Sequence, residues 1–113
     1  MARSGWHILK DDAGVTLCRH LPPRFDFTVS TVLPSGRAVR LAHQIRQDLW
    51  RALQMLRGFS PVVRLEQIAE GWQVIAGGRV AVPVTTAVTA RAQAVLDDTS
   101  NRARWVRSAG RAK

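Results

Sequence analysis

The sequence predicts an α+β fold, a mainly antiparallel sheet of five to six strands covered by one long amphipathic helix, with one or two shorter C-terminal helices. One long segment, 36–57, carries apolar residues at helical spacing along a single side. The segments before and after it are short and bounded by turn residues, which is typical of antiparallel strands. Because 113 residues suit one hydrophobic core, we expect a single domain over 1–113.

The N-terminal part of the chain predicts three strands. We expect a hairpin over 6–20 whose turn lies at 11–14, with Gly14 in a left-handed conformation. The following segment, 25–33, alternates apolar and polar side chains with a period of two, which indicates a half-buried strand. The chain is therefore expected to enter the long helix directly from a strand.

The helix over 36–57 is the clearest element in the sequence. Ser35 stands where a side chain can accept the free N–H groups of a first turn, and Gly58 follows the last apolar position, as expected of a helix end. Roughly 22 residues at about 1.5 Å each give a rod of about 33 Å, long enough to cross a sheet. The apolar stripe spans an arc of about 120°. It consists of Ala38, Leu41, Ala42, Ile45, Leu49, Ala52, Leu53 and Leu56.

Residues 62–82 predict the second group of strands. Glu70 with Gly71 indicates a two-residue turn between antiparallel partners. Gly77 with Gly78 indicates a second tight turn that leads into another short strand. This segment is therefore expected to contain three strands, which brings the sheet to six.

The C-terminal helices are expected within 85–109. Thr85 or Thr86 suits the first cap, and the polar run 97–100 separates the first helix from a short last one. The end of the chain combines several arginines with one tryptophan. We interpret Trp105 as the side chain that docks the last helix, with the arginines around it left in solvent.

The chain is strongly basic. It has 17 Lys and Arg residues against 8 Asp and Glu residues, a net charge of +9, and all of the cations except Lys10 and Lys113 are arginines. A field of this sign attracts phosphate polyanions, which favours nucleic acid as a partner. Codon bias in a GC-rich genome would also select Arg over Lys, although it explains that choice better than the excess over acids. Composition alone leaves both explanations open.

The side of the long helix opposite its apolar stripe is the predicted binding surface. Guanidinium groups there can contact phosphates as paired donors, and an exposed indole can stack a nucleobase. Trp50 lies on the border of this surface; the alternative is that the N-terminal hairpin or the C-terminal helices cover it, since tryptophan is largely buried on average. The predicted binding residues are Arg37, Arg40, His43, Gln44, Gln47, Trp50 and Arg51 on the helix, and Arg102, Arg104 and Arg107 near the C-terminus.

Metal binding and catalysis find little support in the sequence. In the hairpin, a register that pairs Lys10 with Val15 places His7 opposite Cys18, and Cys18 shares a face with His20. The ligand spacing of structural zinc sites is absent, however. No Ser, His and acid triplet and no Gly-rich phosphate loop can be placed either. We therefore expect no metal, no cofactor and no enzymatic activity.

The cellular compartment can also be predicted. A single cysteine excludes an internal disulfide and fits a reducing environment. The start of the chain lacks the apolar run of a signal peptide, and no segment approaches the ~18 consecutive apolar residues of a membrane span. We expect a cytoplasmic protein of bacterial type that does not associate with membranes.

Two functions of different classes fit these observations. The first is nucleic-acid binding through the Arg-rich helix surface, dependent on salt and weakly specific for sequence. The second is a protein-interaction or regulatory adaptor, in which Trp50 or Trp105 is a hot spot beside arginines and the partner is acidic. The choice between DNA and RNA, the sequence specificity and the oligomeric state stay open.

Overall fold

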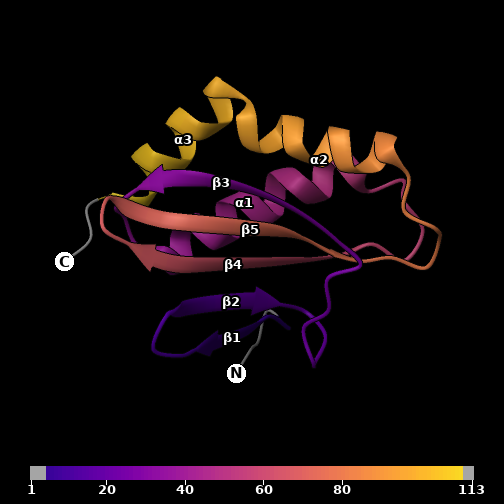
Figure 1. Ribbon diagram of the computed structural model, residues 1–113, viewed down its shortest axis with the longest axis horizontal. Coiled ribbons are helices and arrows are strands. Elements are labelled where there is room, and N and C mark those ends of the chain that lie inside the picture. Colours follow the sequence, from indigo (N-terminus) through magenta and orange to yellow (C-terminus); the bar gives the residue numbers. More distant parts are fainter. Residues whose placement is uncertain (1–4, 111–113) are drawn as a thin grey trace.

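The chain forms a five-stranded antiparallel sheet and three helices, which confirms the α+β fold (Figure 1). The computed structural model describes residues 5–110. The strands are β1 (His7–Lys10), β2 (Gly14–Cys18), β3 (Phe27–Pro34), β4 (Ser60–Ile68) and β5 (Gly71–Arg79), and the helices are α1 (Ala38–Leu53), α2 (Thr86–Asp97) and α3 (Thr99–Ala109). Within the described residues, none of these helices is long and apolar enough to cross a membrane.

The sheet has the strand order β1-β2-β4-β5-β3, so β1 and β3 are its edges. All neighbouring strands are antiparallel. The hairpin register is the predicted one, since Lys10 lies opposite Val15 and His7 opposite Cys18. Strand β3 begins and ends slightly later than the predicted 25–33.

The predicted left-handed conformation of Gly14 is wrong. Gly14 is the first residue of β2 and has no positive φ. A Cβ at this position would lie 1.8 Å from the carbonyl oxygen of Leu65, so the close approach of β4 requires glycine. The turn is held instead by Asp11, whose carboxylate accepts hydrogen bonds from the N–H groups of Ala13 and Gly14.

The tight turn predicted at Gly77 and Gly78 is also wrong, so the sheet has five strands, the lower number of the predicted five to six. Both glycines lie inside β5, where Gly77 pairs with Thr28 and Gly78 with Phe27. A Cβ on Gly77 would lie 2.0 Å from the carbonyl oxygen of Phe27. The two glycines therefore let neighbouring strands approach closely and do not reverse the chain.

The helices differ from the prediction of one long helix with one or two short ones. α1 has 16 residues, while α2 has 12 and α3 has 11. α1 begins after Arg37, no side chain caps it, and Ser35 lies outside it. It ends at Leu53, so Gly58, with a φ of 72°, lies in the turn that follows. α2 does begin as expected, because the side chain of Thr85 accepts a backbone hydrogen bond.

One face of the sheet carries the core. Val29, Ala76, Val63 and Leu17 are paired in a row across β3, β5, β4 and β2, and all four are buried. In Figure 1, α1 crosses the sheet while α2 and α3 run along the side of β3. The buried residues of α1 form the centre of the predicted apolar stripe, which is confirmed. They are Leu41, Ala42, Ile45, Leu49 and Leu53.

Candidate functional site

The polar side of α1 is open to solvent over most of its length. Arg40 donates a hydrogen bond of 3.3 Å to the carbonyl oxygen of Ser108, which ties it to the end of α3. Arg51 lies 3.6 Å from Asp48 of the same helix. The surface is cationic, but two of its arginines are engaged within the fold, one in a hydrogen bond and one in an ion pair. Its exposed predicted residues are Arg37, Arg40, Gln47, Trp50 and Arg51, while His43 and Gln44 are half-buried.

Two of the three predicted C-terminal arginines contact neighbouring elements of the fold, while Arg107 is exposed. Arg102 donates hydrogen bonds of 2.6 Å to the hydroxyl of Thr31 and of 2.6 Å to the carbonyl oxygen of Val32, both on the edge strand β3. Arg104 forms an ion pair of 2.9 Å with Asp48. The expectation that the C-terminal arginines stay in solvent is therefore wrong for Arg102 and only partly met by Arg104, whose side chain is 41% exposed, but it is confirmed for Arg107.

The docking role predicted for Trp105 is confirmed. Its side chain is fully buried, and its Nε1 donates a hydrogen bond of 2.6 Å to Asp48 on α1. The same carboxylate pairs with Arg104, so Asp48 joins α1 to α3. A partner therefore cannot contact the side chain of Trp105 on the folded protein.

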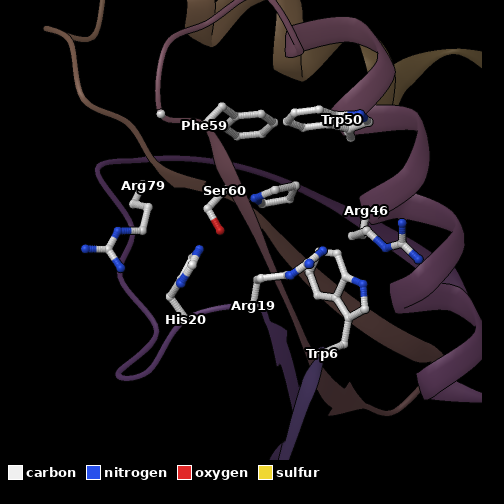
Figure 2. Close-up of a pocket in the computed structure, with 10 residues that line it drawn as sticks. Trp6, Arg19, His20, Arg46, Trp50, Phe59, Ser60 and Arg79 are labelled. Atoms are coloured by element: carbon white, nitrogen blue, oxygen red, sulfur yellow. The ribbon is translucent and has the colours of Figure 1, made fainter. Parts of the chain in front are cut away.

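A groove of about 820 Å³ opens beside α1 at the border where Trp50 lies (Figure 2). Five segments meet there: the residue before β1, the residues after β2, α1, the start of β4 and the end of β5. None of the residues that line the groove is acidic. The aromatic side chains of the groove are Trp6, Trp50 and Phe59, and the basic ones are Arg19, His20, Arg46 and Arg79.

Strand pairing explains why these segments meet. Ser60 and Arg79 face each other where β4 starts and β5 ends. Arg79 reaches this position because β5 runs straight through its two glycines. Trp6 and Arg19 flank the N-terminal hairpin, whose register brings them to the same end of the sheet. The groove therefore depends on the sheet order and not on any local motif.

An aromatic shelf, formed by Trp50 and Phe59, makes one side of the groove. The two rings are nearly parallel, with 7° between their planes and 6.1 Å between their centroids. Phe59 is buried, whereas Trp50 is 42% exposed, so neither the hairpin nor the C-terminal helices cover it. Figure 2 shows both rings edge-on, with Trp6, Arg19 and His20 on the other side of the groove.

Two guanidinium groups lie against the indole of Trp6. The distance from Cζ to the ring centroid is 4.5 Å for Arg46 and 5.4 Å for Arg19, within the range of cation–π contacts. Burial, followed by the nearby charge of Arg19, lowers the pKa of Arg46 from its ordinary value. Arginine nevertheless remains charged in proteins, so this wall of the groove is cationic.

His43 and Arg46 are in contact on the same helix, α1. Nη2 of Arg46 lies 3.1 Å from Nδ1 of His43. Because guanidinium only donates, Nδ1 must accept, which places the histidine proton on Nε2 in the neutral form. Burial, and then the charge of Arg46, lowers the pKa of His43, which favours this neutral state. The ring of His43 also meets the indole of Trp6 edge to face at 6.3 Å.

The arginines of the groove lack ion-pair partners among residues 5–110. No carboxylate there lies within 4.0 Å of the side-chain nitrogens of Arg19, Arg46 or Arg79. Asp26 attracts Arg79 from further away, but it is itself paired at 2.9 Å with another arginine. On the other face of the sheet, Arg64 pairs with two carboxylates. The groove thus concentrates positive charge that the described fold does not neutralise.

The chemistry of the groove is that of anion and aromatic-ring binding. In the described part of the chain, no three His, Cys, Asp or Glu side chains are grouped as metal ligands. Guanidinium groups bind phosphates and carboxylates through paired N–H donors. An exposed indole offers a flat surface to another ring.

The sequence predicts Trp50, in the part of the groove that belongs to α1, but not the residues that the strands contribute. Trp50 belongs to the predicted set, and Arg46 lies beside it on the helix. Trp6, Arg19 and Arg79 are absent from that set, because they come from strand ends that converge only in the folded sheet. The hairpin register already places Trp6 and Arg19 at one end, and this is the signal from which they could be found.

Comparison of the chain with models of known protein families, with characterised proteins and with solved structures gives no match. The groove and the surface of α1 beside it are therefore the features from which a function can be inferred.

Proposed function

We propose that this protein binds nucleic acid through the groove and the adjoining cationic face of α1. The observation that carries the proposal is the presence of Arg19, Arg46 and Arg79, without ion-pair partners among residues 5–110, in the same groove as the exposed ring of Trp50. Proteins that bind single strands combine a positively charged groove with aromatic side chains on which bases stack. Both components are present here within one groove.

Phosphate contacts would supply most of the affinity. Each neutralised phosphate releases counterions, so binding weakens steeply as salt rises. Arg40 and Arg51 lie exposed on α1, where they would extend the contact beyond the groove. Contacts of this kind position the strand but carry no sequence information, so we expect weak sequence preference.

Fluorescence anisotropy with a labelled single strand, at roughly 50 and 200 mM salt, tests the proposal. The double variant R19A/R79A removes two charges from the groove. The matched control K10A/R91A removes two exposed charges outside the groove, one from β1 and one from α2. We expect tight binding at low salt, with the slope of log affinity against log salt reduced by about 1.4 in R19A/R79A and little changed in the control. R40A/R51A should also weaken binding.

Two outcomes would overturn the proposal. The first is an absence of binding at low salt. The second is an equal loss in R19A/R79A and in K10A/R91A, which would mean that net charge and not the groove attracts the strand.

An acidic protein is the second candidate partner. It is favoured by Trp50, because an exposed tryptophan beside arginines is typical of an interface hot spot. Purification after nuclease treatment separates the two functions. An acidic protein that co-purifies with the wild type and is lost from W50A would support this alternative, whereas a complex that the nuclease dissolves would support nucleic acid.

A further inference from the structure

We infer that the groove takes a single unpaired nucleotide of a strand, with its base against the aromatic shelf and its phosphate among Arg19, His20 and Arg79. This inference rests on the proposed function and specifies its ligand. It follows from the division of the groove into a flat aromatic side and a basic side.

The aromatic shelf has the form of a base platform. Phe59 is only 7% exposed and its ring lies nearly parallel to that of Trp50 and beside it, so the two rings together present one flat side to the groove (Figure 2). Bases stack on such rings whatever their sequence, because every base has a π face. The alternative occupant, an aliphatic side chain, would not explain the basic residues on the facing side.

The side of the groove that faces the shelf carries basic residues, which would attract the phosphate of a nucleotide. Arg79 ends β5 and lies opposite Ser60, while Arg19 and His20 follow β2 directly. Figure 2 shows His20 between the two arginines below the shelf, with Arg19 directed toward Trp6 and Arg79 toward the opposite end of the groove. A nucleotide carries its flat base and its charged phosphate at opposite ends, which matches this polarity.

The groove offers one stacking surface and not two. The ring of Trp6 already has the guanidinium groups of Arg46 and Arg19 at 4.5 Å and 5.4 Å from its centroid. Trp6 therefore serves as part of the cationic wall, and the shelf is left as the platform for a single base. The groove volume of about 820 Å³ also lies within the range of pockets that hold one small molecule.

Paired bases cannot use such a platform. In a duplex, the faces of each base are covered by the neighbouring pairs, so a base must leave the stack before it can lie against a side chain. The inference therefore predicts selection by strandedness, in addition to the general attraction of phosphates.

Titration with three labelled probes, each about 12 nucleotides long, tests the inference. The probes are a single strand, the same strand in a duplex, and an abasic sugar–phosphate strand. The wild type should bind the single strand at least tenfold more tightly than either other probe. W50A should lose about 5- to 150-fold in affinity for the single strand, with little change for the abasic strand. W50F keeps a ring at this position and should retain most of the affinity, and circular dichroism checks that both variants fold.

The outcomes separate this inference from the proposed function. Equal binding of single strand and duplex, or an unchanged affinity in W50A, would overturn the single-nucleotide site while leaving nucleic-acid binding intact. A free mononucleotide that binds as tightly as the strand would also overturn it, because the ligand would then not be part of a polymer. Absence of binding to all three probes at low salt would instead overturn the proposed function.

Discussion

Asp48 of α1 binds two side chains of α3, and its replacement offers a quantitative test of how the two helices are held together. Its carboxylate accepts the hydrogen bond of the buried Trp105 indole at 2.6 Å and pairs with Arg104 at 2.9 Å. D48A removes both interactions and leaves the indole N–H without its acceptor. It also removes the 3.6 Å pair with Arg51, which adds little because the Arg51 side chain is 64% exposed. D48N is the matched control, because its amide oxygen can still accept from Trp105 while its charge is lost.

The expected cost of D48A is the sum of three contributions. An unsatisfied buried donor costs about 1–3 kcal/mol. The pair with Arg104, whose side chain is 41% exposed, adds at most about 1 kcal/mol. Alanine returns up to about 0.7 kcal/mol through its higher helix propensity. With the middle of each range, we expect D48A to lower the free energy of unfolding by about 2 kcal/mol and D48N to lower it by about 1 kcal/mol or less.

Urea unfolding measures both values. The midpoint should fall in the order wild type, D48N, D48A, with an unchanged m-value, because the surface exposed on unfolding stays the same. The reasoning would be refuted by a D48A variant within about 0.5 kcal/mol of the wild type, or by a D48N variant that loses as much as D48A. Either result would mean that Asp48 is not the acceptor that secures Trp105.

Three further predictions concern stability. G77A should destabilise the protein by at least about 1–3 kcal/mol, because its Cβ would lie 2.0 Å from the carbonyl oxygen of Phe27; a thermal unfolding midpoint equal to that of the wild type would contradict the close strand contact. Burial lowers the pKa of His43 below 6.5, so the unfolded chain takes up the proton first, and the stability contributed by neutral His43 is complete above about pH 6.5 and is lost as the pH falls from there through the folded-state pKa. The wild type should therefore lose more unfolding free energy than H43Q does when the pH falls from about 7.5 to about 5.5. An NMR titration that places the pKa of His43 above 6.5 would reverse the sign of this pH dependence. R102A should cost about 1–2 kcal/mol, because its charged hydrogen bonds to β3 are lost, whereas the exposed Arg107 can be replaced with a change below about 0.5 kcal/mol; equal urea midpoints for R102A and R107A would contradict the structural role of Arg102.

The apolar stripe of α1 and the hairpin register could be predicted from the sequence because both depend on local periodicity. Leu41, Ile45 and Leu49 repeat at helical spacing, and no tertiary contact was needed to place them on one side. The ends of α1 are different. Ser35 and Gly58 fit the composition of helix ends, but the chain leaves β3 only at Pro34 and α1 starts without a side-chain cap.

The glycines show why local signals mislead. A Gly-Gly pair is a turn signal when only the sequence is considered. Gly77 and Gly78 lie within β5 because β3 and β4 come too close for a Cβ on either residue, and that proximity is decided by strand order. The groove could not be predicted from the sequence for the same reason, since Arg79 joins it only when β5 continues through these glycines.

The most direct test of the proposed function uses the indole N–H signals of the four tryptophans. Trp72 and Trp105 donate theirs within the fold, to the carbonyl oxygen of Gly36 and to Asp48, whereas Trp6 and Trp50 line the groove. A ¹⁵N-labelled sample, with signals assigned by single substitutions, is titrated with an unlabelled single strand at low salt. We predict that the signals of Trp6 and Trp50 shift with the ligand while those of Trp72 and Trp105 stay in place. Binding that leaves Trp6 and Trp50 unmoved, or that moves all four signals alike, would contradict the assignment of nucleic-acid binding to the groove.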